Sequence, residues 1–360
     1  MEKIYNFSAG PSVLPEAAMK QAQKEFLNYR NTGISVLEMS HRSSVFGKII
    51  ESAEQRLRKL LSITDHFQVL FLQGGASLQF AMVPLNLFHD KTGQADFIDT
   101  GSWSGKAIQE AGRYGEVRVV ATSEDENFSY IPELDRGKCN PSADFFHITM
   151  NNTIFGTRFT SIPTTGSVPL VADMSSFILS EAIDISKFGL VYAGAQKNIA
   201  PAGLTIVILR KDLLGRHMAV TPVMLQYKTH ADNKSLYNTP PCFGIYFADL
   251  VFQWIEEMGG IHALETINRE KAGLLYDCID NSRLFRGTSR KEHRSLMNVT
   301  FLLPNEDLTK QFIAEAETNG LIALKGHRSM GGLRASLYNA MPVEGVKKLI
   351  SFMEKFDKKN

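Results

Sequence analysis

The sequence has few of the features that mark membrane, secreted or metal-binding proteins. Its 360 residues include only three cysteines (Cys139, Cys242 and Cys278), which lie too far apart for a zinc-type spacing and form no disulfide framework. No apolar run approaches the roughly 18 residues that span a bilayer. The N-terminal MEKIYNFSAGP lacks the apolar stretch of a signal peptide. We therefore expect a cytoplasmic protein, because free cysteines fit a reducing compartment and nothing in the sequence indicates a membrane partner.

The sequence also lacks an excess of charge of either sign. Lys and Arg number 39 against 38 Asp and Glu, which gives a formal net charge of +1. A balanced charge argues against nucleic acid as the main partner, although it allows a local basic pocket. There is no internal repeat, and no G-x-G-x-x-G follows the first predicted strand, which speaks against a dinucleotide-binding dehydrogenase.

Strand-like and helix-like patterns alternate along the first part of the chain. Short apolar runs bounded by Gly, Pro or Asp predict strands, and longer segments with one apolar face predict helices. The strands are expected at residues 67–72, 95–99, 117–121, 145–149, 168–172, 190–192 and 204–209, and the first two helices at 15–28 and 46–61. This alternation predicts an α/β fold with a mostly parallel sheet.

The pattern changes after Arg210. Residues 218–241 are polar and rich in turn formers, and two long helices are expected at 243–258 and 263–280. A strand, a helix, a short apolar step and a last helix follow, at 297–302, 308–319, 321–324 and 343–356. We therefore predict an irregular N-terminal arm (1–15), a large domain (16–257) and a smaller α+β C-terminal domain (258–360).

A lysine stands at the centre of one of the most apolar stretches, GLVYAGAQKNIAPAGLTIVILR (189–210). Two predicted core strands flank a turn of small residues around Lys197. An amine that loses its hydration becomes neutral and nucleophilic near neutral pH, as Schiff-base lysines do. The alternative is a solvated turn lysine, which is the commoner case for any single lysine.

Four other chemically suggestive positions also follow predicted strands. They are the glycine-rich QGGAS turn (Gly75–Ser77), Trp103, Thr153 and Asp173. A strand, a glycine turn and a helix start together offer free N–H groups to an anion. Ligands gather at the carboxyl ends of the strands in parallel sheets, so we expect these positions to converge with Lys197.

The set matches the needs of a pyridoxal phosphate site. Such a site needs a lysine for the aldehyde, a carboxylate for the ring nitrogen, a flat side chain for stacking and an anion cradle for the phosphate. Lys197, Asp173, Trp103 and Gly75–Ser77 would fill these roles, with Thr153 at the ring oxygen. Three of these positions have a plainer alternative: a helix cap for Asp173, core packing for Trp103 and a turn hydroxyl for Thr153.

Several motifs, taken in order, carry a resemblance to a known family. FSAGPSVLP, HRS, QGGAS, TGSWS, VADMSS, AQKNIAPAG, NTPP and HRSMGGLRASLYNA resemble the phosphoserine aminotransferase family, class V aminotransferases among the fold-type I pyridoxal phosphate enzymes. The resemblance covers essentially the whole chain. One departure is Ala200, where a glycine is common in the family's KN-x-G-PAG motif.

The resemblance implies roles for individual residues. Lys197 would hold pyridoxal 5'-phosphate as an aldimine, with Asp173 at the pyridine nitrogen and Trp103 stacked on the ring. The remaining cofactor contacts would be Gly75, Ala76, Ser77, Gln196 and Thr153. Asn238 and Thr239 would reach the cofactor phosphate of a partner subunit, which implies a homodimer with shared sites.

The resemblance also implies the substrates. L-Glutamate would pass its amino group to 3-phosphohydroxypyruvate in ping-pong order, which gives 2-oxoglutarate and O-phosphoserine, and a related four-carbon step of pyridoxine biosynthesis is a second expected role. Arg42 and Arg334 would bind carboxylates, since their planar forks suit bidentate pairing, and His41, His327 and Arg328 would bind the substrate phosphate. A cysteine desulfurase and a non-enzymatic scaffold of the same fold are the alternatives.

Overall fold

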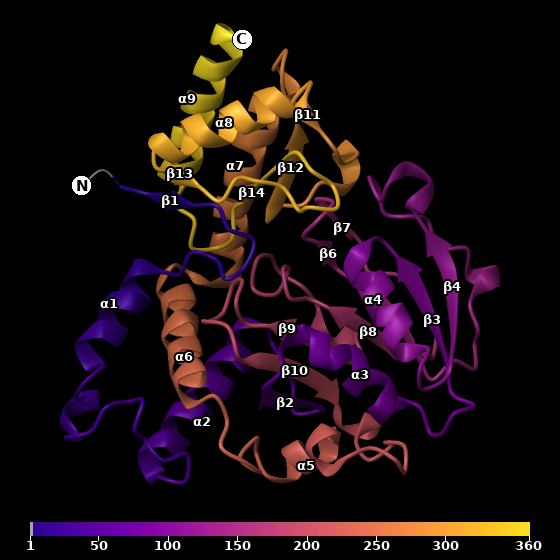
Figure 1. The fold of residues 1–360 in the computed structure, drawn as a ribbon. Coiled ribbons are helices and arrows are strands. Elements are labelled where there is room, and N and C mark those ends of the chain that lie inside the picture. The colour runs from indigo at the N-terminus through magenta and orange to yellow at the C-terminus, as the bar shows by residue number, and fades with distance from the viewer. Residues whose placement is uncertain (1–2) are drawn as a thin grey trace.

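The structure is a computed structural model that describes residues 3–360, so the first two residues of the predicted arm lie outside it. The chain forms a large lower part around one broad sheet and a smaller upper part that holds its C-terminal third (Figure 1). Across residues 3–360, none of the helices combines the length and the apolar character that crossing a bilayer requires.

The lower part is built on a seven-stranded sheet. In spatial order its strands are β2 (Phe67–Leu72), β10 (Thr205–Arg210), β9 (Leu190–Gly194), β8 (Leu170–Asp173), β5 (Phe145–Thr149), β3 (Gln94–Asp99) and β4 (Glu116–Thr122). Only β10 runs antiparallel to its neighbours; the other pairings are parallel. The α/β prediction is confirmed, and β2, β3, β5, β8 and β9 all end at the same edge.

Both faces of this sheet are buried, which explains the nearly continuous apolar runs of its strands. Alternate residues belong to different cores: Val69 and Phe71 of β2 face one, and Leu70 and Leu72 face the other. The first core is covered by α1 (Glu16–Glu25), α2 (Ser44–Leu60) and α6 (Cys242–Glu257), and the second by α3 (Gly75–Leu87), α4 (Ser102–Ala111) and α5 (Tyr227–Asp232) (Figure 1).

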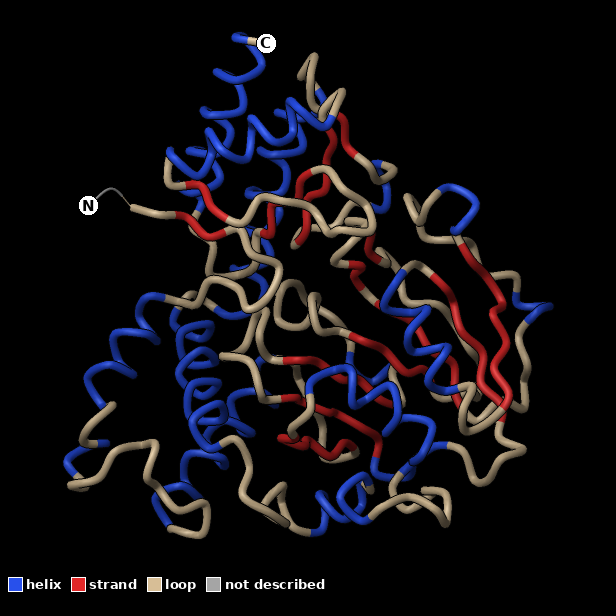
Figure 2. Tube along the Cα trace, viewed as in Figure 1, coloured by secondary structure: helices blue, strands red, loops and turns tan. Residues whose placement is uncertain are grey.

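The upper part has a core of its own. It consists of α7 (Gly260–Asp280), β11 (Arg286–Gly287), β12 (Asn298–Leu302), α8 (Glu306–Thr318), β13 (Leu321–Ile322), β14 (Leu333–Ser336) and α9 (Val343–Lys359). Strands β11, β12 and β14 form a small antiparallel sheet, and the helices gather on one side of it (Figure 2). The sequence predicted most of these elements but not β14.

The N-terminal arm differs from the prediction of an irregular segment. Its strand β1 (Tyr5–Asn6) pairs in parallel with β13, so the start of the chain is built into the C-terminal part (Figure 1). Phe7 is fully buried in the core of that part. A two-residue strand has no periodicity of its own, and its formation depends on a partner more than 300 residues away along the chain.

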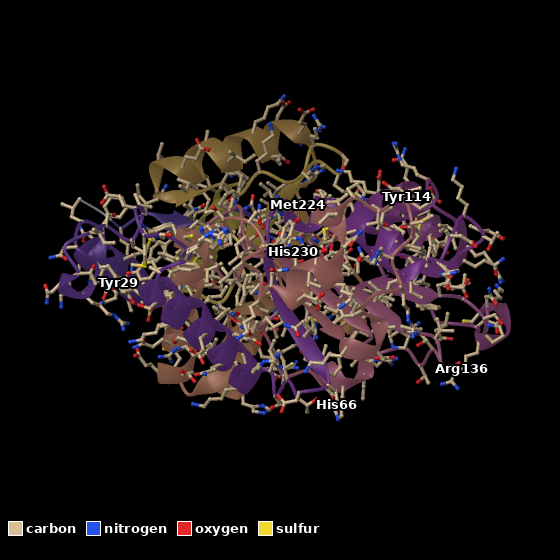
Figure 3. All side chains as sticks on the ribbon, turned by 90° about the horizontal axis from the view of Figure 1, so that it is seen from below. Tyr29, His66, Tyr114, Arg136, Met224 and His230 are labelled. Carbon is tan, nitrogen blue, oxygen red and sulfur yellow. The ribbon has the colours of Figure 1, made fainter. Side chains whose placement is uncertain are left out.

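The turn-rich stretch 218–241 is also more ordered than its composition suggests. It includes the short helix α5, and a ring nitrogen of His230 lies 2.8 Å from the carbonyl oxygen of Met224, on the underside of the molecule (Figure 3). The Ser235 hydroxyl accepts a hydrogen bond of 3.0 Å from the Phe71 amide, which covers the edge strand β2. The NTPP loop that follows therefore starts from a fixed point.

Candidate active site

Lys197 lies in the turn that joins β9 to β10, at the edge where the parallel strands end. Its side chain is buried, and its Nζ donates a hydrogen bond of 2.6 Å to the Thr153 hydroxyl. Burial lowers the pKa of the amine to about 8; the Arg334 charge also lowers it, whereas Asp173 raises it. The solvated-turn alternative is therefore wrong, and this lysine has the low pKa that a nucleophilic amine needs.

Thr153 is placed by a small hairpin, β6 (Asn151–Asn152) and β7 (Thr157–Arg158), that the sequence did not predict. Its hydroxyl accepts from Lys197 and donates to the Ser176 hydroxyl at 3.0 Å. Ser176 in turn donates to the Asn151 carbonyl at 2.9 Å. This chain of hydrogen bonds fixes the direction in which the Thr153 hydroxyl offers its lone pair to the amine.

Asp173 is the last residue of β8 and is buried. Burial raises the pKa of its carboxyl, and the hydrogen bond from Ser175 and the charge of Lys197 lower it. One carboxylate oxygen accepts a hydrogen bond of 2.8 Å from the Ser175 amide, but residues 174–184 form turns and no helix, so the alternative of a helix-capping carboxylate is wrong. An opposite charge beside a buried carboxylate favours its ionised form, so a protonated ring nitrogen is a suitable partner for Asp173.

Trp103 stands in the first turn of α4, directly after β3. The Nζ of Lys106, one turn further along the helix, lies 4.6 Å from the centre of the Trp103 ring. The indole N–H is buried and has no hydrogen-bond partner within the described chain. The ring is half-buried and packs against the second core, so the core-packing alternative is correct in part.

The glycine turn QGGAS opens helix α3. Gly74 has φ +91° and Gly75 has φ +66°, conformations that favour glycine, and a Cβ on Gly74 would overlap the Leu78 side chain. No side chain caps the helix, so the first amides, those of Gly75, Ala76 and Ser77, are open to an anion.

A group of cations lies around His327, and one of them, Arg334, also faces Lys197. Arg334, on β14, is half-buried and donates from its Nη1 to the Thr153 carbonyl at 3.3 Å. Burial lowers the pKa of His327, and the charges of Arg334, Arg328 and Lys106 lower it further, which shows that these groups lie near one another. Such a local excess of positive charge in a nearly neutral chain suits a substrate with several negative charges.

Four of the predicted site residues are not joined to Lys197 within this single chain. His41 is half-buried, with its Nε2 unpartnered among the described residues, and the Arg42 side chain is exposed. Asn238 and Thr239 are exposed in the NTPP loop, and Gln73, next to the glycine turn, donates to the Thr239 carbonyl at 2.9 Å.

The departure at Ala200 has little effect. Ala200 is buried in the core beneath the lysine turn, and its amide donates to the Ala195 carbonyl at 2.9 Å. Its φ is not positive, unlike the φ of several other non-glycine residues of the described chain. The methyl group is therefore accommodated without backbone strain.

Sequence reasoning missed four side chains that shape the site: Lys106, Ser176, Ser12 and Tyr338. Ser176 belongs to the VADMSS motif, and Lys106 stands three residues after Trp103, which is one helical turn. These two positions carried a signal that could have been used. Ser12 and Tyr338 also lie in motifs of the resemblance, FSAGPSVLP and HRSMGGLRASLYNA, but nothing local indicates their partners, which lie far away in the sequence.

The residues present fit pyridoxal phosphate. They offer a buried amine with a lowered pKa, a buried carboxylate beside it, an uncapped helix start and an aromatic side chain with an unpartnered N–H. These four features lie on four different strand-to-helix or strand-to-strand connections at one sheet edge.

Comparison with known proteins points the same way. The family model described as aminotransferase class-V matches residues 4–349. A phosphoserine aminotransferase of Bacillus cereus is 55% identical over 360 residues, which cover 100% of both chains. One of Listeria monocytogenes is 54% identical over 358 residues, or 99% of this chain and 97% of the relative.

Solved structures give the same picture. A structure of phosphoserine aminotransferase from Bacillus circulans subsp. alkalophilus aligns with a TM-score of 0.96 and 47% identity, and covers 100% of this chain and 99% of that one. A structure that records radiation damage of the Schiff base in phosphoserine aminotransferase aligns with a TM-score of 0.97 and 46% identity over 100% of both chains.

Proposed function

The chain belongs to the class V aminotransferase family, among the phosphoserine aminotransferases, and we propose that Lys197 and the cations around it carry out the amino transfer of that family. L-Glutamate would donate the amino group and 3-phosphohydroxypyruvate would accept it, which gives 2-oxoglutarate and O-phospho-L-serine in a reversible, ping-pong reaction. The buried Lys197 amine that bonds to Thr153 at 2.6 Å is the observation that carries this proposal.

When bound, pyridoxal phosphate supplies an aldehyde for the amine and an electron sink for the negative charge at Cα. Lys197 would then act as an acid and base that moves the proton of Cα, since its pKa of about 8 leaves the amine able both to accept and to give a proton near neutral pH. Thr153 would hold the amine in place between these steps. Asp173 would keep its charge opposite the ring nitrogen, and Trp103 would pack on the ring.

The substrates would be bound by the cations. Arg334 would pair with a substrate carboxylate, because a guanidinium that is half-buried and held by the Thr153 carbonyl presents its remaining N–H groups in a fixed direction. Arg42 would bind a second carboxylate. His41, His327 and Arg328 would bind the substrate phosphate.

We propose a homodimer in which Asn238 and Thr239 contribute to the cofactor phosphate site of the partner. Both are exposed in one chain, as expected for residues that serve another subunit. Exposed large apolar side chains surround the same region, which supports an interface there. They are Phe26, Leu27, Ile34 and Leu37 between α1 and α2, and Val220, Val223, Met224 and Tyr237 around α5.

Two further proposals concern organisation and location. The arm (1–15), the large domain (16–257) and the small domain (258–360) would act as separate units around the site, which is supported by the separate core of the upper part. A cytoplasmic location is supported by the three cysteines, which form no disulfide in the described chain.

The test is an absorbance spectrum of the purified protein with pyridoxal phosphate, recorded before and after addition of L-glutamate, and then after 3-phosphohydroxypyruvate. We expect a visible band that glutamate removes and 3-phosphohydroxypyruvate restores. Lys197→Ala should lose both the band of the lysine-bound cofactor and turnover, while Lys187→Ala, at an exposed lysine on the preceding connection between β8 and β9, should keep them. A Lys197→Ala protein with normal turnover would exclude the proposal.

Spectra recorded with added cysteine or O-phosphoserine address the desulfurase alternative. Cys242 is the cysteine nearest the NTPP loop, and burial raises the pKa of its thiol. A raised pKa keeps the thiol protonated and poorly nucleophilic, which disfavours sulfur transfer. A band that responds to cysteine and not to O-phosphoserine would favour the desulfurase instead.

A further inference from the structure

The N-terminal arm touches both the lysine turn and the C-terminal part. Tyr5–Asn6 and Phe7 are fixed in the C-terminal part, through the pairing of β1 with β13 and a hydrogen bond of 3.2 Å from the Ser336 amide to the Phe7 carbonyl. Five residues later, the Ser12 amide donates to the Gln196 carbonyl at 3.0 Å, and the Ser12 hydroxyl donates to the Lys197 carbonyl.

The segment between these two anchors passes close to the Lys197 side chain at Gly10. A methyl group on Gly10 would stand 3.6 Å from Cγ and 3.8 Å from Cε of Lys197, which is ordinary van der Waals contact. The arm main chain at Gly10 therefore runs beside the aliphatic part of the Lys197 side chain, with room for a methyl group between them. Within residues 3–15, the described part of the arm, no side chain is hydrogen-bonded to the amine, so the arm affects the position of Lys197 and adds no charge beside it.

The Tyr338 side chain is hydrogen-bonded to the middle of the arm, at Ala9. Its hydroxyl donates a hydrogen bond of 2.8 Å to the Ala9 carbonyl and accepts one of 3.2 Å from the side-chain amide of Asn298. Burial raises the pKa of Tyr338 to about 12, and Thr153 is close enough to lower it. Tyr338 follows β14, the strand that carries Arg334. One tyrosine therefore connects the strand of the substrate-binding arginine to the segment that runs beside Lys197.

We propose that residues 9–12 form a bridge that positions Lys197 relative to Arg334, with Ser12 and Tyr338 as its two positioning residues. This inference rests on the proposed function of Lys197 and adds the residues that position its side chain. Neither residue touches a reacting atom. Each acts through the arm, because loosening either end would let the main chain at Gly10 move away from the lysine and let water in.

Admission of water would change the ionisation of Lys197 itself. Burial is the largest cause of its lowered pKa, and the charged groups facing it are Asp173 and Arg334. Neither charge is altered when Ser12 or Tyr338 loses its hydroxyl. Tyr338 also lies close to Thr153, the partner of the Lys197 amine, so a change in the pKa of Lys197 reports the arm where Ser12→Ala shows it as well as Tyr338→Phe.

The experiment uses the cofactor-free full chain and the variants Tyr338→Phe, Ser12→Ala and the double variant. Competitive labelling with acetic anhydride over a range of pH, read by mass spectrometry of the Lys197 peptide, gives the pH midpoint of the amine. We expect each single variant to raise that midpoint by about one pH unit, as renewed hydration favours the charged amine. The double variant should match the larger single effect, because either loss alone frees the bridge.

Two controls separate this role from a loss of general stability. Tyr276→Phe removes a buried hydroxyl that donates to the Ser295 carbonyl at 2.9 Å, and Ser180→Ala removes one that donates to the Phe177 carbonyl. Neither contacts the arm, and both should leave the midpoint unchanged. Hydrogen exchange at the Ser12 amide should be faster in Tyr338→Phe than in Tyr276→Phe.

The outcomes are distinct. An unchanged midpoint in both single variants, or effects that add in the double variant, would overturn the bridge. The proposed function is tested separately by treating the wild-type protein with pyridoxal phosphate and borohydride, which should modify Lys197. If Lys197 is modified but the variants behave like wild type, the bridge fails and the proposed function stands; if Lys197 is not modified, the proposed function fails.

Discussion

Removing the charge of Asp173 should make the Lys197 amine a better nucleophile at neutral pH in the cofactor-free protein. Burial lowers the pKa of Lys197 from 10.5 to about 8. That change means that charging the buried amine costs about 3 kcal/mol more than charging an exposed one. At pH 7 about 9% of the amine is neutral, against about 0.03% for an ordinary lysine, so burial raises the reactive fraction about 300-fold.

Asp173 works against this effect, because its negative charge raises the pKa of Lys197. Asp173→Asn keeps an oxygen for the Ser175 amide but removes the charge. A nearby opposite charge typically shifts a pKa by at least about one unit, so the neutral fraction at pH 7 should rise from about 9% to about 50%, roughly fivefold. Competitive labelling with acetic anhydride would measure this directly, since that probe needs no cofactor pocket.

Asp184→Asn is the matched control. Asp184 also accepts a hydrogen bond from the amide two residues ahead, that of Ser186, at 3.0 Å, but it is exposed on the loop before β9. This variant should leave the labelling of Lys197 unchanged. The reasoning would be refuted if wild-type Lys197 titrated near 10, because the amine would then be hydrated, or if Asp173→Asn raised its midpoint.

Three other perturbations have definite expected results. Arg334→Lys should raise the KM of L-glutamate and of O-phosphoserine about tenfold with a smaller change in kcat, since a lysine cannot form the bidentate pair with a carboxylate. Arg216→Lys, at an exposed arginine, should leave both KM values unchanged. Gly74→Ala should lower the free energy of unfolding by about 2 kcal/mol in a denaturant titration, because Gly74 has a positive φ and a methyl group there would overlap Leu78. Gly47 lies inside α2 with open space around it, so Gly47→Ala should raise the free energy of unfolding by about 0.5 kcal/mol. The unfolding free energy of the cofactor-free protein should rise between pH 8 and 10.5, because in that range the unfolded state binds more protons than the folded state at Lys197 and at Lys271, whose pKa is also lowered by burial. Lys197→Met should make this rise smaller, with the part that comes from Lys271 remaining.

The sequence was a good guide to the large sheet. Strands such as β2 and β5 are buried on both faces, so they appear as uninterrupted apolar runs with Gly, Pro or Asp at their ends, and their predicted bounds, 67–72 and 145–149, are confirmed. The convergence of the strand ends followed from the parallel topology. The sequence alone therefore predicted that Lys197, Thr153 and Asp173 lie at one edge of the sheet.

The parts that the sequence did not predict are those that depend on distant partners. Strand β1 exists because β13 pairs with it, and the hairpin around Thr153 consists of strands of two residues. No local pattern marks such elements. The bond from Tyr338 to Ala9 joins residues 329 positions apart, and neither residue type suggests the other.

The spread of the site over the chain has a consequence for folding. Lys197 and Thr153 are 44 positions apart, and Arg334 and Thr153 are 181 apart, so the site exists only after several crossovers and the C-terminal part are in place. Contacts of such long range form slowly and late. A cofactor that needs all of them can stabilise the finished protein by mass action but offers no template to the unfolded chain. Pyridoxal phosphate should therefore slow the unfolding of this protein while leaving its refolding rate unchanged.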